Sequence, residues 1–278
     1  MARSPSKQWV AEASGPDAVG TRGKTAAQRL RRLDMFLAAF DPGLLKEADS
    51  VVVDLGYGRV PVTTSEWFGR LQKRWPHVHM IGVERDAERV NAADGYAEPG
   101  LCFRRGDFRI PIQAGEQVRL IRAMNVLRQY DESAALPAHR QILAQAATGA
   151  LLAEGTCDPL GRTMVVQLLR SDESGMPVSE GLLFATSFHG ALDPRLFQAV
   201  LPKHLIHRVV PNEPIFEFFE AWVRSAEITR AQAEFGAKQH FVAAAEHLSS
   251  LIEGVEIRRT WLRKGWLLWR HAPYPNPI

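Results

Sequence analysis

Short apolar runs separated by helix-like segments dominate the first half of the chain. Runs of this kind cover residues 50–55 (SVVVDL), 79–84, 101–107, 118–126 and 150–157. They are short and rich in β-branched or aliphatic residues, as expected for strands that are buried on both faces of a parallel sheet. Their alternation with helical segments predicts an α/β fold with a doubly wound, mostly parallel, Rossmann-like sheet.

The intervening segments carry helix signals. Apolar residues recur at three- and four-residue spacing from about 25 to 40, which predicts an amphipathic helix that ends at Asp41-Pro42-Gly43. Thr63 followed by Glu66 fits a capping box at the start of a second helix. Further helices are expected at about 85–93 and 133–147. Residues 1 to about 20 read as a flexible leader.

The second half has a different pattern. Residues 163–170 and 181–188 predict two strands joined by a polar turn, a candidate inserted hairpin, and helical segments follow at about 194–201, 215–235 and 238–253. Two strand-like runs around Lys264-Gly265 predict a terminal antiparallel hairpin. Trp266 and Trp269 fall on opposite faces of a strand there, so both can be buried only if the sheet is covered on both sides.

The expected organisation is therefore a leader and basic helix at 1–43, followed by one domain at 44–278. We expect that domain to hold a seven-stranded sheet with an insertion at about 158–236 on the substrate side. The length of 278 residues allows one α/β core with extra segments.

Composition narrows the class of protein. Apolar residues make up 46% and charged residues 23%, which excludes wholesale disorder. No apolar run is long enough to span a bilayer, and the opening residues lack the apolar stretch of a secretory signal, so a soluble cytoplasmic protein without a membrane partner is expected. Cys102 and Cys157 should then be reduced. The net charge of +3 is mild, with the basic residues concentrated in 22–32.

The glycine turn after the first strand is the strongest candidate site. Asp54 ends the strand, and Gly56 and Gly58 let the backbone pass close to a ligand, at a helix start with free amide donors. The dinucleotide fingerprint needs a third glycine, where this chain has Pro61. A carboxylate at Asp54 would repel a pyrophosphate and could accept from an ammonium group. These features favour S-adenosylmethionine over a dinucleotide, and a purely structural glycine turn is the alternative.

Residues that end the next strands extend this candidate site. Glu84 could accept both ribose hydroxyls, or be solvated beside Arg85. Asp107 could accept from the adenine amino group while Phe108 packs against the ring, or it could form a surface turn. Asn125 lies where open α/β sheets bind ligands, although it could equally bond its own backbone.

In their order, these motifs resemble those of class I S-adenosylmethionine-dependent methyltransferases. The resemblance covers D-L-G-x-G after the first strand, an acidic residue ending the second, G-D after the third, T-G-A-L-L-A-E before the fifth, and VEIRRTW…WLLWRH at the end. The segments RGKTAAQRLRRLD, PVTTSEW and NVLRQYDE also resemble actinobacterial proteins described only as predicted methyltransferases. The family's usual third glycine is Val60 here.

The resemblance implies a cofactor, S-adenosyl-L-methionine, and a set of residues that contact it. By resemblance, Asp54 and Gly56 hold the methionine end, Glu84 the ribose and Asp107 the adenine, while Asn125 lies near the methyl group. Four neighbours complete the expected cofactor contacts: Tyr57, Gly58, Arg85 and Phe108.

The implied reaction is in-line displacement at the sulfonium methyl, with a small molecule as the expected acceptor. The catalytic residues are unknown from the sequence. Five residues are candidates to deprotonate or orient an acceptor, and packing or solvation is the alternative for each: Tyr130, His139, Glu154, Asp158 and His189. No metal site is expected, because neither His77 and His79 nor the cysteines have a completing ligand pattern.

Three other functions remain open at this point. The basic segment could bind RNA, which would make the chain an RNA methyltransferase. The chain could bind S-adenosylmethionine or S-adenosylhomocysteine without catalysis, since it lacks a recognisable acceptor motif. A nicotinamide dehydrogenase is disfavoured by Asp54 and the missing third glycine. The acceptor and the oligomeric state, a dimer included, are not determined by the sequence.

Overall fold

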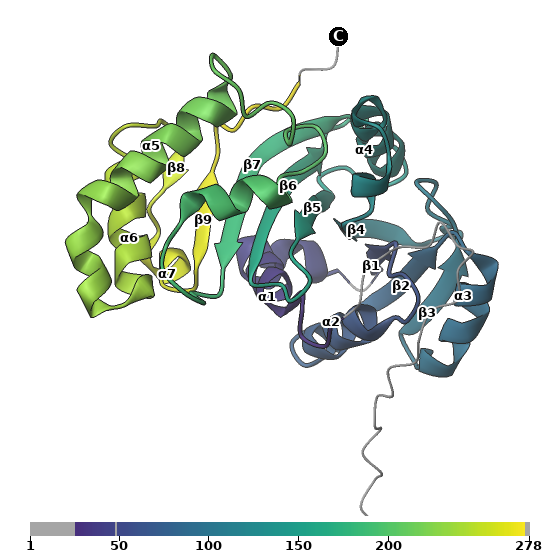
Figure 1. The fold of residues 1–278 in the computed structure, drawn as a ribbon. Coiled ribbons are helices and arrows are strands. Elements are labelled where there is room, and N and C mark those ends of the chain that lie inside the picture. The colour runs from purple at the N-terminus through teal and green to yellow at the C-terminus, as the bar shows by residue number, and fades with distance from the viewer. Residues whose placement is uncertain (1–25, 48, 276–278) are drawn as a thin grey trace, which may run out of the picture.

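The computed structural model describes residues 26–47 and 49–275. Within these residues nine strands form one sheet with helices packed on both of its faces (Figure 1). The strands are β1 (Ser50–Leu55), β2 (His79–Glu84), β3 (Leu101–Arg105), β4 (Gln117–Met124), β5 (Leu151–Cys157), β6 (Thr163–Ser171), β7 (Pro177–Thr186), β8 (Val255–Glu256) and β9 (Trp266–Trp269).

The helices fill the connections between these strands. The α-helices are α1 (Arg31–Phe40), α2 (Val62–Gln72), α3 (Ala87–Ala93), α4 (Ala135–Leu143), α5 (Pro214–Ile228), α6 (Ala237–Leu248) and α7 (Arg259–Leu262). Short 3-10 helices are η1 (Pro42–Leu45), η2 (Asp94–Tyr96), η3 (Leu127–Gln129), η4 (Glu132–Ala134), η5 (Pro194–Val200) and η6 (Arg230–Phe235). No helix among the described residues has both the length and the apolar character needed to cross a bilayer.

The sheet has a parallel half and an antiparallel half. Its strand order is β3-β2-β1-β4-β5-β6-β7-β9-β8. Strands β1 to β5 pair in parallel, and β6, β7, β9 and β8 continue the sheet with antiparallel pairs. The order reverses between β1 and β4, and open α/β sheets bind ligands beyond the carboxyl ends of the strands at such a point.

This topology confirms the predicted α/β fold and corrects its details. The sheet has nine strands among the described residues, whereas the pattern predicted seven. The two runs predicted as an inserted hairpin do pair with each other, but β6 also pairs with β5 along its length and extends the main sheet. At the end of the chain β8 and β9 pair antiparallel as expected, with α7 between them in place of a tight turn.

Two helix starts also differ from the sequence prediction. Helix α1 begins at Arg31, and the residues from 26 to 30 form turns. Helix α2 begins at Val62 after Pro61, so Thr63 lies inside the helix and caps nothing. Glu66 instead accepts hydrogen bonds from the backbone N–H and side chain of Gln28. The predicted leader and the basic residues Arg22 and Lys24 lie outside the described residues.

Both faces of the sheet are buried. One apolar cluster joins α1, α2, α3 and α7 to the first face, while α4, α5 and α6 cover the second. Trp266 packs edge-on against Phe36 of α1 at 5.4 Å, and Trp269 stacks on Phe218 of α5 at 4.3 Å. The two tryptophans of β9 therefore lie in the cores on opposite faces of the sheet. Both can be buried because helices cover the sheet on both faces, as the sequence analysis required.

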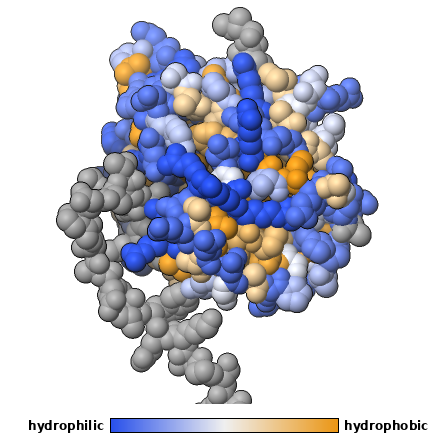
Figure 2. All heavy atoms as spheres, turned by 90° about the vertical axis from the view of Figure 1, so that its right-hand side faces the viewer, coloured by the Kyte–Doolittle hydropathy of each residue, from blue (hydrophilic) through white to orange (hydrophobic). Residues whose placement is uncertain are grey.

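The β3 edge of the sheet is protected by charge. Arg104 forms a paired salt bridge with Glu116, with the closer N–O distance at 2.6 Å, and the exposed Arg105 lies beside it. The face of the molecule at this end is largely hydrophilic, with hydrophobic residues scattered between polar ones (Figure 2). Charged side chains on an edge strand oppose pairing with another chain.

A buried ionic network ties the first face of the sheet to its helices. Arg122 in β4 is 0% exposed. Its Nε and Nη2 donate to the two carboxylate oxygens of Asp54 at 2.9 and 2.7 Å, and its Nη1 pairs with Asp34 of α1. The guanidinium also lies 4.2 Å from the ring of Trp67 in α2. One arginine thus joins β4, β1, α1 and α2.

The charges of this network compensate one another. Burial raises the pKa of Asp34 to about 6, against the opposing effects of Arg122 and Arg70, so the carboxylate remains ionised at pH 7. Burial works to lower the pKa of Arg122, but Asp54 and Asp34 together raise it above its usual value. The network therefore holds two carboxylates and the Arg122 guanidinium in a region that excludes water, with Arg70 at its partly exposed border.

Replacement of Arg122 by Met should destabilise the protein strongly, because Asp34 and Asp54 would lose a buried cation. We expect a loss of roughly 3–5 kcal/mol in the free energy of unfolding, measured by urea denaturation. The control is Arg119→Met on the same strand, where the pair with Asp49 is long (3.8 Å) and partly exposed. That variant should lose no more than about 1 kcal/mol. Equal losses in the two variants would contradict the proposed importance of the network.

Candidate functional site

The turn after β1 brings two glycines to the carboxyl edge of the sheet. Gly56 and Gly58 both have positive φ angles, of 72° and 82°. A Cβ atom at Gly56 would lie 2.6 Å from the Val126 side chain, whereas one at Gly58 would meet no atom of the described residues within 4 Å. Gly56 is therefore required by packing between the turn and the end of β4, and Gly58 faces open space.

Glu84 at the end of β2 turns back toward this glycine turn. Its Oε2 accepts a hydrogen bond of 2.9 Å from the backbone N–H of Gly58, and its Oε1 accepts one of 2.9 Å from Arg85 N–H. The residue is 8% exposed. A carboxylate offers about four acceptor positions, so Oε2 can accept a further hydrogen bond. The exposed side chain of Arg85 is directed away from the buried core.

Asp54 faces the core network, and its position changes the electrostatic argument drawn from sequence. Besides the two bonds from Arg122, its Oδ2 accepts a hydrogen bond of 2.6 Å from Thr64 Oγ1. Arg122 compensates the negative charge of Asp54. Repulsion between Asp54 and a pyrophosphate is therefore no longer a reason to favour S-adenosylmethionine over a dinucleotide. What Asp54 does provide is a rigid support for the turn that carries Gly56 and Gly58.

Tyr57 is buried between the two glycines. Its ring packs edge-on against Phe103 of β3 with a centroid distance of 5.3 Å. Its hydroxyl lies 3.5 Å from the carbonyl oxygen of Arg89. The ring thus anchors the turn onto β2 and β3. From the sequence we expected Tyr57 to contact the cofactor and did not anticipate this packing role.

The loops after β3 and β4 meet over the same edge. The ring of Phe108 lies 5.1 Å from that of Tyr130. Asp107 is exposed, and its Oδ1 accepts from the backbone N–H of Arg109 at 2.7 Å. The side chain of Gln145 donates to the Phe108 carbonyl at 3.0 Å and so holds the first loop in place.

Asn125 links the end of β4 to the end of β5. Its Oδ1 accepts from the backbone N–H of Cys157 at 3.1 Å, and its Nδ2 lies 3.4 Å from Cys157 Sγ. Its φ of 62° places it in the left-handed region. Asn125 therefore shapes the edge between the two strands.

The described part of the basic segment, residues 26–32, packs against the protein. Arg29 Nε donates to the Asp158 carbonyl at 3.2 Å, and Arg32 Nη1 donates to the Lys264 carbonyl at 3.1 Å. Two of the arginines on which the RNA-binding hypothesis rests therefore donate hydrogen bonds to backbone carbonyls, while Arg31 is exposed.

The candidate acceptor residues separate into two places. Tyr130, Asp158 and His189 lie toward the carboxyl edge, and Asp158 is held by backbone N–H groups of Leu160 and Thr163. His189 lines a small cavity at the same edge, beyond β5. Apolar and hydroxyl side chains line most of it, including Thr163, Thr186, Phe188, Leu192, Phe197 and Phe241. His139 and Glu154 are instead buried together under α4.

His204 was missed by the sequence reasoning and lies beside this buried pair. Burial lowers its pKa to about 3, with smaller contributions from His139 and Arg208, so its ring is neutral at pH 7. Arg122 was missed as well. An arginine inside the apolar run of β4 was the available signal, because a buried cation requires a buried anion.

Comparisons with known proteins add a likeness of fold. The sequence matches no protein-family model, and no curated protein matches it significantly. Among solved structures, LepI in complex with SAM has 18% identity and a TM-score of 0.32, over 40% of this chain and 28% of LepI. The plantazolicin methyltransferase BpumL with SAH has 11% identity and a TM-score of 0.37, over 47% of each chain.

A third solved structure is that of CalS10, an amino pentose methyltransferase from Micromonospora echinaspora with SAM bound. It has 18% identity and a TM-score of 0.36, over 59% of this chain and 69% of CalS10. The chain thus spans less than half the length of LepI and of BpumL. Every one of these TM-scores is below 0.5, so the likenesses say nothing of the function of this chain.

Substitution of Gly56 by Ala should cost more than substitution of Gly58, because only Gly56 packs against Val126. Both variants should lose about 1–2 kcal/mol in unfolding free energy from the positive φ. Gly56→Ala should lose roughly 1–3 kcal/mol more from overpacking. The double variant Gly56→Ala/Val126→Ala should recover that extra part in a double-mutant cycle measured by urea denaturation. Losses of unfolding free energy that simply add in the double variant would contradict the contact between Gly56 and Val126.

Proposed function

We propose that this chain binds S-adenosylmethionine at the carboxyl edge of β2, β1 and β4 and transfers its methyl group to a small molecule. The proposal rests mainly on one observation: Glu84 accepts a hydrogen bond from the Gly58 N–H, beside the point where the strand order reverses. A buried carboxylate with an acceptor position left, next to an open glycine, fits a ribose that approaches the backbone closely.

The neighbouring residues fit the rest of such a cofactor. The Phe108 and Tyr130 rings, which approach each other over the edge, offer an apolar surface for adenine. Asp107 lies next to Phe108 and is exposed, so its carboxylate can accept from an exocyclic amino group. The start of α2 has no side-chain cap, so its N–H groups are available to a carboxylate at the methionine end.

Methyl transfer from this cofactor depends on alignment of the acceptor with the methyl group and does not require a nucleophile from the protein. When bound, the cofactor supplies an electrophilic methyl group, and the protein positions the acceptor in line with it and excludes water. The cavity lined by Thr163, Thr186 and His189 lies at the same edge of the sheet, because β6 begins and β7 ends there. Its largely apolar lining suits a small acceptor, and His189 can take up a proton from an acceptor hydroxyl or amine.

Glu84→Gln should weaken cofactor binding selectively. One carboxylate oxygen becomes an NH₂ group, which accepts no hydrogen bond, so the side chain can no longer accept both the existing N–H bond and a ribose hydroxyl through that atom. A lost hydrogen bond to a charged group costs about 1.5–3 kcal/mol. We therefore expect calorimetric titration with S-adenosylmethionine to give binding roughly 10- to 100-fold weaker than for the intact protein.

The matched control for this titration is Glu88→Gln, an exposed carboxylate in the first turn of α3, which should bind as the intact protein does. A nicotinamide dinucleotide is titrated in parallel, since Asp54 is charge-compensated and does not by itself exclude one. No binding of S-adenosylmethionine by the intact protein would refute the proposal.

Methyl transfer itself should be visible with a labelled cofactor. Incubation of the protein with methyl-labelled S-adenosylmethionine and the small-molecule fraction of a cell extract should give a labelled product that Glu84→Gln forms more slowly. Label in added RNA would instead support the RNA methyltransferase alternative. Tight cofactor binding without any labelled product would support a non-catalytic binding protein.

A further inference from the structure

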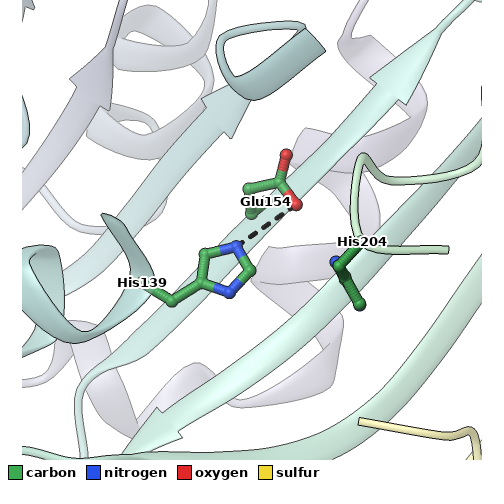
Figure 3. A group of neighbouring side chains, drawn as sticks. All are labelled: His139, Glu154 and His204. Carbon is green, nitrogen blue, oxygen red and sulfur yellow. Dashed lines mark ion pairs between the residues drawn. The ribbon is translucent and has the colours of Figure 1, made fainter. Parts of the chain in front are cut away.

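Three ligand-type side chains from distant parts of the chain meet in the second core. His139 comes from α4, Glu154 from the middle of β5, and His204 from the loop between η5 and α5 (Figure 3). One ligand atom of each lies within 4.8 Å of the others. All three residues are buried, with exposed fractions of 0%, 1% and 3%. They lie where the apolar cluster under α4 borders the one under α5 and α6.

Four buried polar atoms of this cluster lack hydrogen-bond partners among residues 26–47 and 49–275. His139 Nε2, Glu154 Oε2 and both ring nitrogens of His204 are buried without one. Buried polar atoms are nearly always satisfied, because an unpaired one has lost its water and gained nothing in return. Because one ligand atom of each residue lies within 4.8 Å of the others, these unpaired atoms indicate a bound group that contacts all three residues.

The charge of the cluster favours a cation over a water molecule. Glu154 is a buried carboxylate whose one ion pair within the described part of the chain is with His139 Nε2, at 3.5 Å. Neither an arginine nor a lysine of the described residues forms an ion pair with it. A buried carboxylate requires a positive charge beside it or gives up its own charge. A divalent metal would supply that charge and also coordinate one unpaired nitrogen of each histidine.

The geometry of the donor atoms suits a transition metal. Ligands about 2.0–2.1 Å from a tetrahedral metal lie roughly 3.3 Å apart, close to the separation of His139 Nε2 and Glu154 Oε2. His139 Nδ1, on the other side of the ring, is 3.0 Å from Tyr274 Oη. Metal-binding histidines commonly donate their second N–H in this way, which fixes the ring orientation.

We propose that His139, Glu154 and His204 bind one divalent transition metal, for which zinc is the best match to two imidazoles and a carboxylate. Three protein ligands leave a coordination position for water. The metal fastens α4, β5 and the loop before α5 to one another, and through Tyr274 it also holds the C-terminal segment. This role is independent of the cofactor site, which lies at the carboxyl edge of the sheet.

Access to the site is offered at Tyr274. Its ring is partly exposed and lines a surface cavity together with Asp172 and Met176 of the β6–β7 turn and Val178 of β7. Movement of the segment around Tyr274 would open a route to His139 without disrupting the sheet.

The test uses the full-length protein. Metal content is measured after purification by mass spectrometry of the elements, and the protein is then stripped with a chelator and titrated with Zn²⁺ and with Co²⁺. We expect one equivalent of metal, a rise in the melting temperature on metal addition, and Co²⁺ absorption bands in the visible range that are typical of nitrogen and oxygen ligands.

The variants identify the ligands. His204→Gln and Glu154→Gln should each weaken Zn²⁺ binding by more than the roughly 10- to 100-fold expected for loss of an outer partner such as Tyr274 in Tyr274→Phe. The control is His207→Gln, an exposed histidine three residues after His204, which should bind Zn²⁺ as the intact protein does. His204 makes no hydrogen bond to any residue that the structure describes, so His204→Gln should fold. This variant keeps the test valid even if Glu154→Gln does not fold.

Two results would overturn the proposal. One is that the intact stripped protein binds neither Zn²⁺ nor Co²⁺ in stoichiometric amount and shows no shift in melting temperature. The other is that metal binds equally well to the intact protein and to His204→Gln, which would place the bound metal elsewhere.

Discussion

The salt bridge between Arg122 and Asp54 is the interaction on which the first half of this protein depends. It joins the centre of β4 to the end of β1, where the glycine turn starts, and it lies in a region from which water is excluded. Through Asp34 and Trp67 the same guanidinium also holds α1 and α2. Because a buried charge is tolerated only with its partners in place, this network specifies how the N-terminal helix packs and where the turn is held.

The second constraint is that the sheet is covered on both faces from β2 to β9. The antiparallel strands β6, β7 and β9 continue the parallel half, and α5 and α6 close the second face over them. A strand such as β9 can therefore carry one tryptophan into each core. The group of His139, Glu154 and His204 lies at the border between two apolar clusters of that face, where it can join the two halves.

The molecule thus separates its polar groups into two kinds of place. At the carboxyl edge, Glu84 ends β2 beside the glycine turn, and the exposed Asp107 and His189 lie on loops that follow strands. In the interior, Asp54 and Glu154 each form an ion pair with a side chain from another element. Carboxylates of the same type therefore serve different purposes, because burial decides whether a charge meets solvent, a ligand or another part of the chain.

Local pattern was enough to predict most strands and their order of appearance, because a buried strand needs a short apolar run whatever its neighbours are, but it did not predict one nine-stranded sheet. It also placed Asp54, Gly56, Glu84 and Asn125 at strand ends. What only the tertiary structure decided are the contacts between residues distant in sequence: Arg122 on Asp54, His204 beside His139 and Glu154, and the pairing of β6 with β5. Side-chain charge and hydrogen-bonding capacity are properties of a residue, but the partner that satisfies them is set by how the elements pack in space.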